Sequence, residues 1–389
     1  MNEKEYWFWL SGLKYIHRND IGRLLEFFGS PEEIYRASRE DLLECGVLDE
    51  VQICEMTLAG KQYDITSEMK KLEHKGIRYI CCTEDVFPDK LKNIPDRPYA
   101  LYVKGQLPEN SSPSCGIVGA RACSSYGKQT AFSAGADIAA KGISIISGMA
   151  LGIDAEASKG ALSAGGKTFV VLGGGVDVVY PLQNMSLYYD ILDNGGGIIS
   201  EYPPGTEPIG WQFPQRNRLI SGLSDCVIIV EARKRSGTLV TANYALEQGR
   251  DVYAVPGRIT DALSYSCNRL LYDGARIFLD PADVIEDLYG AAGYNRVFNA
   301  APAPSAAGRR RRKLKAADVT DDLRVEKGSP EEAVYRVLSE RPAYLADISK
   351  VSGVGQVEAS AILTGLEFKG LAEEVSADCY RDRKSTRLN

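Results

Sequence analysis

In residues 76–290, short apolar runs alternate with longer amphipathic segments. Apolar runs rich in valine and isoleucine, with helical segments between them, are typical of a parallel sheet covered by helices on both faces. Helices are expected at Leu239–Gly249 and Ala282–Tyr289, among others. The expected strands are Arg78–Cys82, Gly116–Gly119, Ile143–Ser147, Thr168–Gly173, Gly197–Glu201, Cys226–Glu231, Asp251–Val255 and Arg276–Leu279. The pattern therefore predicts an α/β core.

The turn from Ser147 to Asp154 is the element around which we expect this core to be organised. It follows the apolar run Gly142–Ile146 and opens into a predicted helix at Ala155–Leu162. Ligands of parallel sheets bind beyond the carboxyl ends of the strands, and backbone N–H groups at such a turn favour an anion. Gly148 and Gly152 carry no Cβ, so we expect another molecule to approach the main chain here.

Residues 1–75 show helical spacing instead. Apolar side chains recur through Ile21–Phe28, Gly29 ends that segment, and Ser30 followed by Pro31 begins the next helix. Short helices joined by glycine turns predict a helical domain of the helix-hairpin-helix or SAM-like kind. A docking or folding module without a ligand of its own is the simpler interpretation.

The C-terminal part divides into a linker, a second small domain and a tail. Residues 291–328 contain an Ala/Pro-rich stretch and a basic run, so they predict a linker that is either merely solvated or adds nonspecific phosphate affinity. Residues 329–380 show three helical segments and a short strand, which predict a winged helix. Its third helix, 356–369, carries two glutamates and one lysine, which favours a protein contact over DNA. Residues 381–389 show no periodicity.

Composition narrows the class of protein. The chain has 389 residues, of which 44% are hydrophobic and 25% charged, as in soluble globular proteins. Its formal net charge of −6 means that affinity for nucleic acid must come from a local basic patch. Nine cysteines occur without a C-x-x-C pair, and no signal peptide or membrane-spanning run is evident. We expect a reduced, cytoplasmic protein without membrane contact.

Several kinds of chemistry are disfavoured by the residues present. The two histidines, His17 and His74, both precede the predicted sheet, which argues against a Ser/His/Asp or Cys/His nucleophile and against a zinc site. Gly165–Thr168 resembles the end of a P-loop but precedes a strand, and Gly173–Gly175 lacks the third glycine of a dinucleotide fingerprint because Val178 stands there. We therefore predict no catalytic residue, no metal and no cofactor.

Anion-binding turns and a few cations remain. Arg121 comes just after a predicted strand, where it can clamp a phosphate. Ser236 and Thr238 precede a helix and can both cap it. Phe213 lies close in sequence to Arg216 and Arg218, and an aromatic ring beside guanidinium groups suits single-stranded nucleic acid. The alternative is that Phe213 belongs to the core and that the arginines pair with carboxylates such as Glu201 or Glu231.

Asp154 is the one carboxylate in the organising turn. It could act as a general base. A structural use is favoured, because an Asp at this place more often caps the helix that begins at Ala155.

A series of motifs in one order resembles the DNA-processing protein A (DprA/Smf) family over roughly residues 80–280. The motifs are Val118–Arg121 with Tyr126-Gly127, Ser147–Asp154, Val171–Asp177 with Tyr180-Pro181, Ser200–Pro203, Phe213-x-x-Arg-Asn-Arg218 with Ser221–Ser224, Ser236–Ala242 and Ala254–Gly257. The flanking regions also resemble family members that have an N-terminal helical domain and a C-terminal winged helix.

The resemblance implies an extended Rossmann core that binds single-stranded DNA, forms a homodimer, and loads the RecA recombinase onto incoming strands during natural transformation. The family's phosphate-binding arginine falls on Arg121 and its stacking aromatic on Phe213. The candidate DNA-binding residues are Gly119, Arg121, Ser147, Gly148, Gly152, Gly173, Gly174, Phe213, Arg216, Asn217, Arg218, Ser236, Gly237 and Thr238.

Two positions depart from the family pattern. Glu156 stands where members often have histidine, and Gly210 stands where many carry a basic residue. The second departure predicts weaker DNA binding unless Arg216 or Arg218 compensates.

Two other functions stay open at this point. The core also resembles lysine-decarboxylase-like phosphoribohydrolases, which carry P-G-G-x-G-T-x-x-E, but Thr241 stands where their catalytic Glu belongs. A protein-interaction adaptor that works through residues 329–377 is the other possibility.

Overall fold

The computed structural model describes residues 1–13, 15–59, 64–299, 329–338, 343–368, 371–376 and 379–382. The chain forms two compact units, Met1–Ala303 and Pro304–Asn389. No helix among the described residues is both long and apolar enough to cross a membrane.

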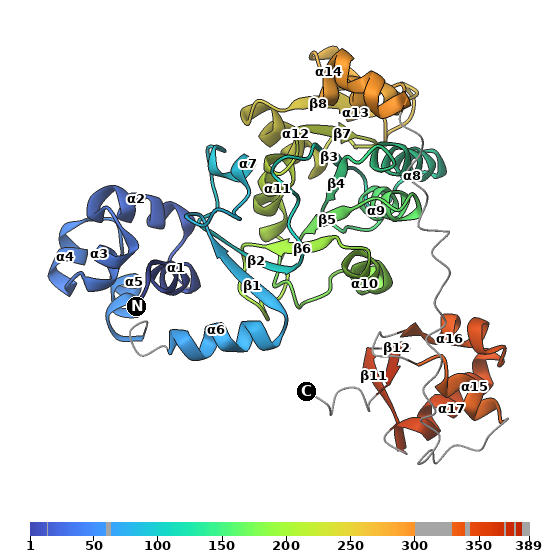
Figure 1. Ribbon diagram of the computed structural model, residues 1–389, viewed down its shortest axis with the longest axis horizontal. Helices are drawn as coiled ribbons and strands as arrows, with labels where there is room; N and C mark the ends of the chain where they lie inside the picture. The colour runs from blue at the N-terminus through green and yellow to red at the C-terminus, as the bar shows by residue number, and fades with distance from the viewer. Residues whose placement is uncertain are drawn as a thin grey trace. The chain divides into compact units, whose positions relative to one another are not determined.

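The first unit begins with short helices gathered at one end of it, drawn in blue in Figure 1. Their starts carry the caps that the sequence predicts: the Ser30 side chain accepts from the backbone N of Glu33, and Pro31 occupies the first helical position. The elements are α1 (Glu3–Gly12), α2 (Arg18–Phe28), α3 (Pro31–Arg36), α4 (Arg39–Glu44), α5 (Glu50–Cys54), the π-helix η1 (Glu55–Ala59) and α6 (Ile65–His74).

A nine-stranded sheet follows, in the order β1-β2-β6-β5-β4-β3-β7-β8-β9. Its strands are β1 (Ile77–Cys81), β2 (Ala100–Gly105), β3 (Ser114–Val118), β4 (Ser144–Ser147), β5 (Thr168–Val171), β6 (Gly197–Ser200), β7 (Cys226–Ile229), β8 (Asp251–Ala254) and β9 (Arg276–Ile277). The neighbouring strands β6, β5, β4, β3, β7, β8 and β9 all pair parallel, as predicted. The expectation of an all-parallel sheet is wrong at one side, because β1 and β2 pair antiparallel and β2 was not predicted.

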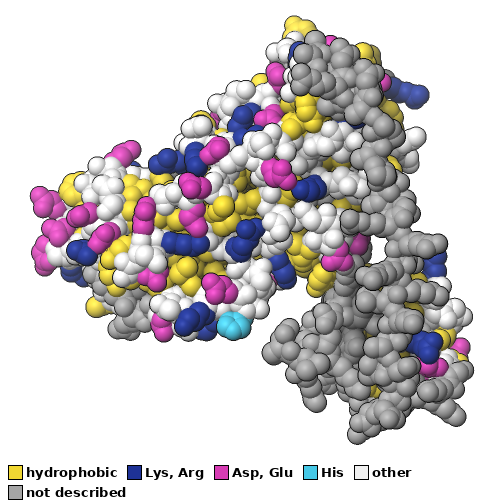
Figure 2. Space-filling view, viewed as in Figure 1, with side chains coloured by type: hydrophobic (Ala, Val, Ile, Leu, Met, Phe, Trp, Pro, Cys, Tyr) yellow, Lys and Arg dark blue, Asp and Glu magenta, His cyan; other side chains and the backbone are white. Residues whose placement is uncertain are grey.

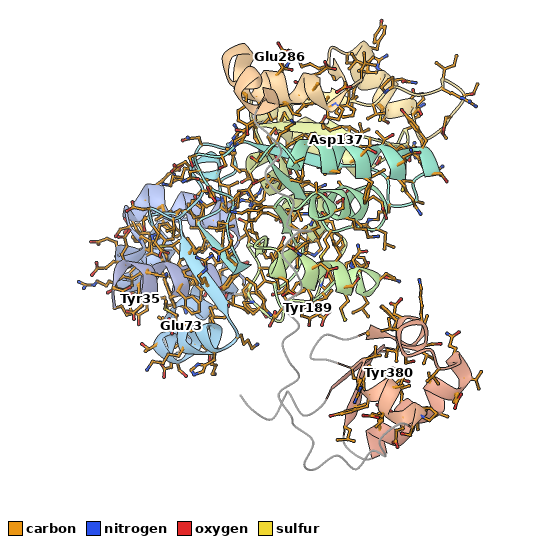
Figure 3. All side chains as sticks on the ribbon, turned by 45° about the vertical axis from the view of Figure 1, so that its right-hand side comes forward. Tyr35, Glu73, Asp137, Tyr189, Glu286 and Tyr380 are labelled. Atoms are coloured by element: carbon orange, nitrogen blue, oxygen red, sulfur yellow. The ribbon has the colours of Figure 1, made fainter. Side chains whose placement is uncertain are left out.

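Helices cover both faces of the parallel strands (Figure 1). Neighbouring residues of one strand enter different cores, as Ile117 and Val118 of β3 do, because successive side chains point to opposite faces. Asp137 on α8 and Glu286 on α14 mark two helices of one face (Figure 3). The helices are α7 (Asp89–Lys92), α8 (Ser125–Ala139), α9 (Ile153–Ser163), η3 (Leu182–Asn184, 3-10), α10 (Met185–Asp193), α11 (Gln212–Gly222), α12 (Thr238–Glu247), α13 (Tyr265–Tyr272) and α14 (Pro281–Asn299).

The order in which successive strands are added to the sheet reverses between the neighbouring parallel strands β3 and β7. From β3 the chain continues to β4, β5 and β6 on one side, whereas β7, β8 and β9 lie on the other. The helix after β3, α8, packs on one face, and the helix after β7, α12, packs on the opposite face. Such a switch point opens a crevice at the carboxyl ends of the two strands, which is where ligands bind in open α/β sheets.

The helical segment α14 is interrupted at Gly290, whose φ is +66°, one residue before the predicted start of the linker at 291, and helical residues continue beyond it to Asn299. The rest of that predicted linker, 300–328, lies outside the described residues, as does most of the predicted tail.

The second unit contains α15 (Pro330–Tyr335), β10 (Ala343–Tyr344), α16 (Leu345–Ser352), α17 (Gln356–Phe368), β11 (Ala372–Ser376) and β12 (Cys379–Asp382). Its strands pair antiparallel in the order β10-β12-β11. Val334, Ile348 and Leu363 are fully buried between the helices. The winged helix stays a prediction for this unit.

Helices α8 and α9 approach so closely that glycine is required between them. A Cβ on Gly160 would lie 2.0 Å from the carbonyl oxygen of Phe132. We expect Gly160→Ala to lower the free energy of unfolding by about 2 kcal/mol, because the packing clash outweighs the gain in helix propensity. Urea unfolding followed by circular dichroism measures the change. Gly12→Ala, where no atom lies within 4 Å of the new Cβ, is the control and should have a much smaller effect.

Candidate functional site

The turn after β4 is held by two buried charged side chains. The Asp154 carboxylate accepts from the backbone N–H of Gly148 at 3.1 Å and of Gly119 at 3.4 Å. The Arg216 guanidinium donates to the carbonyl of Gly148 at 3.0 Å and to that of Val171. The peptide groups on both sides of Gly148 are thus bonded within the protein.

Asp154 does not have the capping role that we expected. Helix α9 begins at Ile153, one residue before the Asp, and its N-cap is Gly152. The carboxylate instead joins the loop after β3 to the turn after β4. A structural role is what the structure shows, through a different set of bonds.

Burial shifts the pKa values of both side chains. Burial raises the pKa of Asp154, whereas the Arg216 charge and the bonded backbone N–H groups lower it. Burial lowers the pKa of Arg216 to about 10, and the nearby Asp154 charge opposes that shift. Arg216 therefore remains a cation at neutral pH, with 5% of its surface exposed.

The glycines of this turn serve the protein's own packing. A Cβ on Gly148 would lie 2.7 Å from both the Arg216 guanidinium and the Asp154 carboxylate. Gly152 has a φ of +78°, and a Cβ there would lie 2.4 Å from the carbonyl oxygen of Arg121. The expectation that Gly148 offers a bare amide to another molecule is wrong, because its N–H is already bonded to Asp154.

The accessible part of the site is an aromatic pair beside an exposed cation. The rings of Phe213 and Tyr180 stack with centroids 5.6 Å apart and planes 30° apart. The exposed guanidinium of Arg121 lies 5.1 Å from the Phe213 ring centroid, and that of Arg216 lies 6.0 Å from it. A small cavity of about 50 Å³ is lined by Arg121, Gly148, Tyr180, Phe213 and Arg216, among others. Cations near an aromatic face are attracted to it, which fixes the ring and the guanidiniums together.

Arg218 follows the alternative interpretation. It is fully buried and bonded to Glu201, with its Nε 3.5 Å from a carboxylate oxygen of Asp96. Arg18 of α2 pairs with the same two carboxylates. This cluster ties α11 to the N-terminal helices, so neither Arg218 nor the buried Arg216 offers an accessible charge in place of the one absent at Gly210.

The other predicted residues support the site from below or beside it. Ser147 is buried and donates to the carbonyl of Ile117, and Gly173 lies under Phe213, where a Cβ would come within 3.0 Å of the ring. Gly174 is buried against Thr206. Asn217 donates to the carbonyl of Gly237 at 3.3 Å and so joins α11 to the loop before α12.

The predicted double cap of α12 is wrong. The N-cap is Gly237, without a side-chain bond, and Thr238 is buried. The Ser236 hydroxyl accepts from the backbone N–H of Thr238 at 3.2 Å, which leaves that amide unavailable to an anion.

Sequence reasoning missed two features of this edge. Tyr180, which stacks on Phe213, was quoted as part of a motif but not as a site residue. Arg233, Lys234 and Arg235 lie in the loop after β7, separated from its end by three residues, and are exposed. The signal was present, because three cations lie between a predicted strand end and a predicted helix start.

A larger cavity lies elsewhere. It measures about 450 Å³ and is lined by residues of α6 and β1 that include Glu73, labelled in Figure 3. It contains none of the predicted site residues. Among the described residues no group of three or more His, Cys, Asp or Glu side chains could hold a metal ion. On the face shown in Figure 2, basic and acidic side chains are interspersed over the first unit.

A Rossmann-like sheet with cations and aromatic rings at its carboxyl edge defines the class of α/β proteins that hold an anionic ligand beyond their parallel strands. The chain belongs to the family described as DNA recombination-mediator protein A, whose model matches residues 78–289.

Individual relatives agree with this assignment. The chain is 33% identical to Protein Smf of Escherichia coli (strain K12) over 74% of this chain and 76% of that protein. It is 42% identical to DNA processing protein DprA of Streptococcus pneumoniae over 52% of this chain and 72% of that protein. The X-ray structure of DNA processing protein A from Streptococcus pneumoniae covers 74% of this chain and 98% of its own, at 34% identity and a TM-score of 0.62. The predicted family and Rossmann-like fold are confirmed.

The bonds at Gly148 lead to a stability prediction. Asp154→Ala removes the acceptor of two backbone N–H groups and leaves Arg216 without its nearby carboxylate, so we expect the free energy of unfolding to fall by about 3 kcal/mol. Asp154→Asn keeps one acceptor oxygen and should lose less. Urea unfolding measures both. Glu156→Gln on the same helix, which removes only an exposed pair with Lys159, should change stability by less than about 0.5 kcal/mol. Equal losses in all three variants would contradict the role assigned to Asp154.

Proposed function

We propose that this protein binds single-stranded DNA at the carboxyl edge of its sheet and acts as a mediator of recombination. The observation that carries the proposal is the half-buried Phe213 ring, which stacks with Tyr180 and lies beside the exposed guanidinium of Arg121. Aromatic rings stack on unpaired bases, and guanidinium groups bind phosphates. Membership of a family described as DNA recombination mediators supports the same role.

The contact set that we propose is smaller than the predicted one. Arg121, Tyr180 and Phe213 contact the strand, with Asn217, Ser236 and the partly exposed Gly119 and Gly152 beside them. Arg216 positions the turn from below, and Arg218 is left out because it is buried and paired with Glu201. Side-chain charge, rather than bare amide groups, then supplies most of the affinity.

A non-enzymatic role fits the residues at the strand ends. Asp154 and Arg216 are buried and bonded to the backbone, so neither is placed to move a proton to or from a ligand. Thr241, at the position of the phosphoribohydrolase glutamate, is buried as well. We propose that the DNA is held and left chemically unchanged. If purified protein releases base from nucleoside monophosphates with turnover, this part of the proposal is wrong.

We further propose that the protein forms a homodimer and loads the RecA recombinase onto the bound strand. The description of the family as recombination mediators supports a recombinase partner. The second unit, with acidic side chains on α17 such as Glu358, is the part of the chain to which we assign a protein contact.

The proposal predicts a loss of affinity in Arg121→Ala. We expect binding to a fluorescent oligothymidylate to weaken about tenfold, because one charge-assisted phosphate contact is lost. The slope of log K against log salt should flatten by about 0.7, the value for one phosphate on a single strand. Fluorescence anisotropy at several salt concentrations measures both quantities.

The matched control is Arg23→Ala, which removes an exposed arginine of α2 that lies outside the site. It should leave affinity and slope unchanged. The wild-type protein should also prefer the single strand to a duplex of the same length. If the Arg121→Ala protein binds the oligothymidylate as tightly as the Arg23→Ala protein does, the assignment of the DNA site to this edge is wrong.

A further inference from the structure

The loop between β7 and α12 carries three neighbouring cations. Arg233, Lys234 and Arg235 are exposed, and none of them forms an ion pair with a carboxylate in the part of the chain that the structure describes. Other exposed arginines of the first unit, such as Arg36 and Arg39, do have acidic partners. In a protein of net charge −6, three adjacent cations without acidic partners form a local site of positive potential.

The backbone of this loop is fixed on several sides. The Glu231 carboxylate at its start accepts from the backbone N–H of Ser124 at 2.9 Å and from its hydroxyl at 2.5 Å. Asn217 donates to the carbonyl of Gly237 at its end, and the Ser266 hydroxyl donates to the carbonyl of Arg233 at 2.7 Å. The loop is therefore joined to the β3–α8 loop that carries Arg121 and to the helix that carries Phe213.

The sheet order places these cations beside the proposed DNA site. Strands β3 and β7 are neighbours, with Val118 opposite Ile229, so their carboxyl ends lie about 5 Å apart. Arg121 follows β3, and Arg233–Arg235 follow β7, at the two sides of the topological switch point. Cations therefore follow both of the strand ends that flank this switch point.

A second aromatic ring lies at the far side of this loop. Tyr265, the first residue of α13, is 46% exposed, and the Lys234 ammonium lies 5.6 Å from its ring centroid. A cation over a half-exposed ring repeats the arrangement of Arg121 over Phe213. It offers stacking for a base and charge for the adjoining phosphate.

On the β6 side of the sheet most of the arginines near the site are paired, although Arg97 is exposed and lies 5.6 Å from the Tyr99 ring centroid. At the β6 side, Arg218 and Arg18 are paired with the carboxylates of Glu201 and Asp96. Glu207, in the segment that follows β6, is exposed and adds a negative charge. Three adjacent cations without acidic partners follow β7, so a polyanion that leaves the Phe213–Tyr180 pair is attracted more strongly toward β7 than toward β6.

We propose that the single strand continues from Phe213 past Arg121 onto a second binding station formed by Arg233, Lys234 and Tyr265. This inference rests on the proposed function and adds to it the direction of the strand and a longer footprint. At a strand spacing of about 4.8 Å, the three steps from the end of β5, below Phe213, to the end of β7 span about 14 Å, enough for two or three extended nucleotides.

Oligonucleotide length tests the second station. The probes are 5′-labelled (dT)4, which fills the Phe213 station, and (dT)12, which reaches both. The variant Arg233→Gln/Lys234→Gln should bind (dT)12 about tenfold more weakly and flatten its salt slope by about 1.4, the value for two phosphates. Its affinity for (dT)4 should stay within twofold of the unmodified protein. Arg121→Ala, in contrast, should weaken both probes.

The control removes the same two charges elsewhere. Arg23 and Lys70 are exposed on α2 and α6, so Arg23→Gln/Lys70→Gln has the same net charge as the test variant. It should bind both probes normally. Tyr265→Ser should weaken (dT)12 about tenfold, and Tyr265→Phe should restore it, because the ring and not the hydroxyl does the stacking.

The outcomes separate this inference from the function on which it rests. If the unmodified protein binds neither probe, the proposed function fails and the second station falls with it. If it binds both probes but the Arg233→Gln/Lys234→Gln variant matches the control on (dT)12, the second station alone is refuted. Equal weakening of (dT)4 and (dT)12 would also refute it, because the loop would then act through general charge or through the Phe213 station.

Discussion

The carboxyl edge of the sheet depends on the hydrogen bonds that two buried charged side chains form with the backbone of Gly148. Asp154 holds the N–H side of this residue and Arg216 the carbonyl side, and each also reaches a neighbouring strand end. The ends of β3, β4 and β5 are thereby fixed to one another. Since Arg216 belongs to the same helix as Phe213, these hydrogen bonds also determine the position of the Phe213 ring. The two buried charges are tolerated because each side chain is hydrogen-bonded to backbone groups and because the two charges have opposite signs.

Burial assigns different roles to the three arginines of the predicted site. Arg216 is bonded to the backbone beneath the turn, Arg218 is paired with Glu201 and Asp96, and Arg121 is the exposed one of the three. The same residue type thus supports the turn in one place, joins two helical parts in another, and provides an exposed cation in the third. The carboxylates that pair with Arg218, Glu201 and Asp96, come from distant parts of the chain. The spacing of Arg216 and Arg218 along α11 therefore does not reveal which of them is paired.

The sequence was sufficient for the parallel strands, because β3 to β8 are continuous apolar runs flanked by helices. It was insufficient for β2, since Ala100–Gly105 is followed by no helical crossover and pairs antiparallel with β1 and β6. The motifs predicted Arg121 and Phe213 as site residues, and the structure places the Arg121 guanidinium 5.1 Å from the Phe213 ring centroid. The amide of Gly148 and the double cap of α12 were misjudged, because the bond from Gly148 to Asp154 and the start of the helix at Thr238 become visible only once the backbone is folded.

The departures from the family pattern fall where packing imposes no constraint. Gly210 has no atom within 4 Å of the place a Cβ would take, and Glu156 pairs only with Lys159 on the surface of α9. Neither touches the bonds around Gly148, so the framework of the edge is kept while its exposed charges differ. Because the backbone amides of Gly148 and Thr238 are bonded within the protein, the charge that this edge presents to solvent is set by its exposed side chains. Loss of a cation at one end of the crevice can then be offset by cations at the other without any change in the fold.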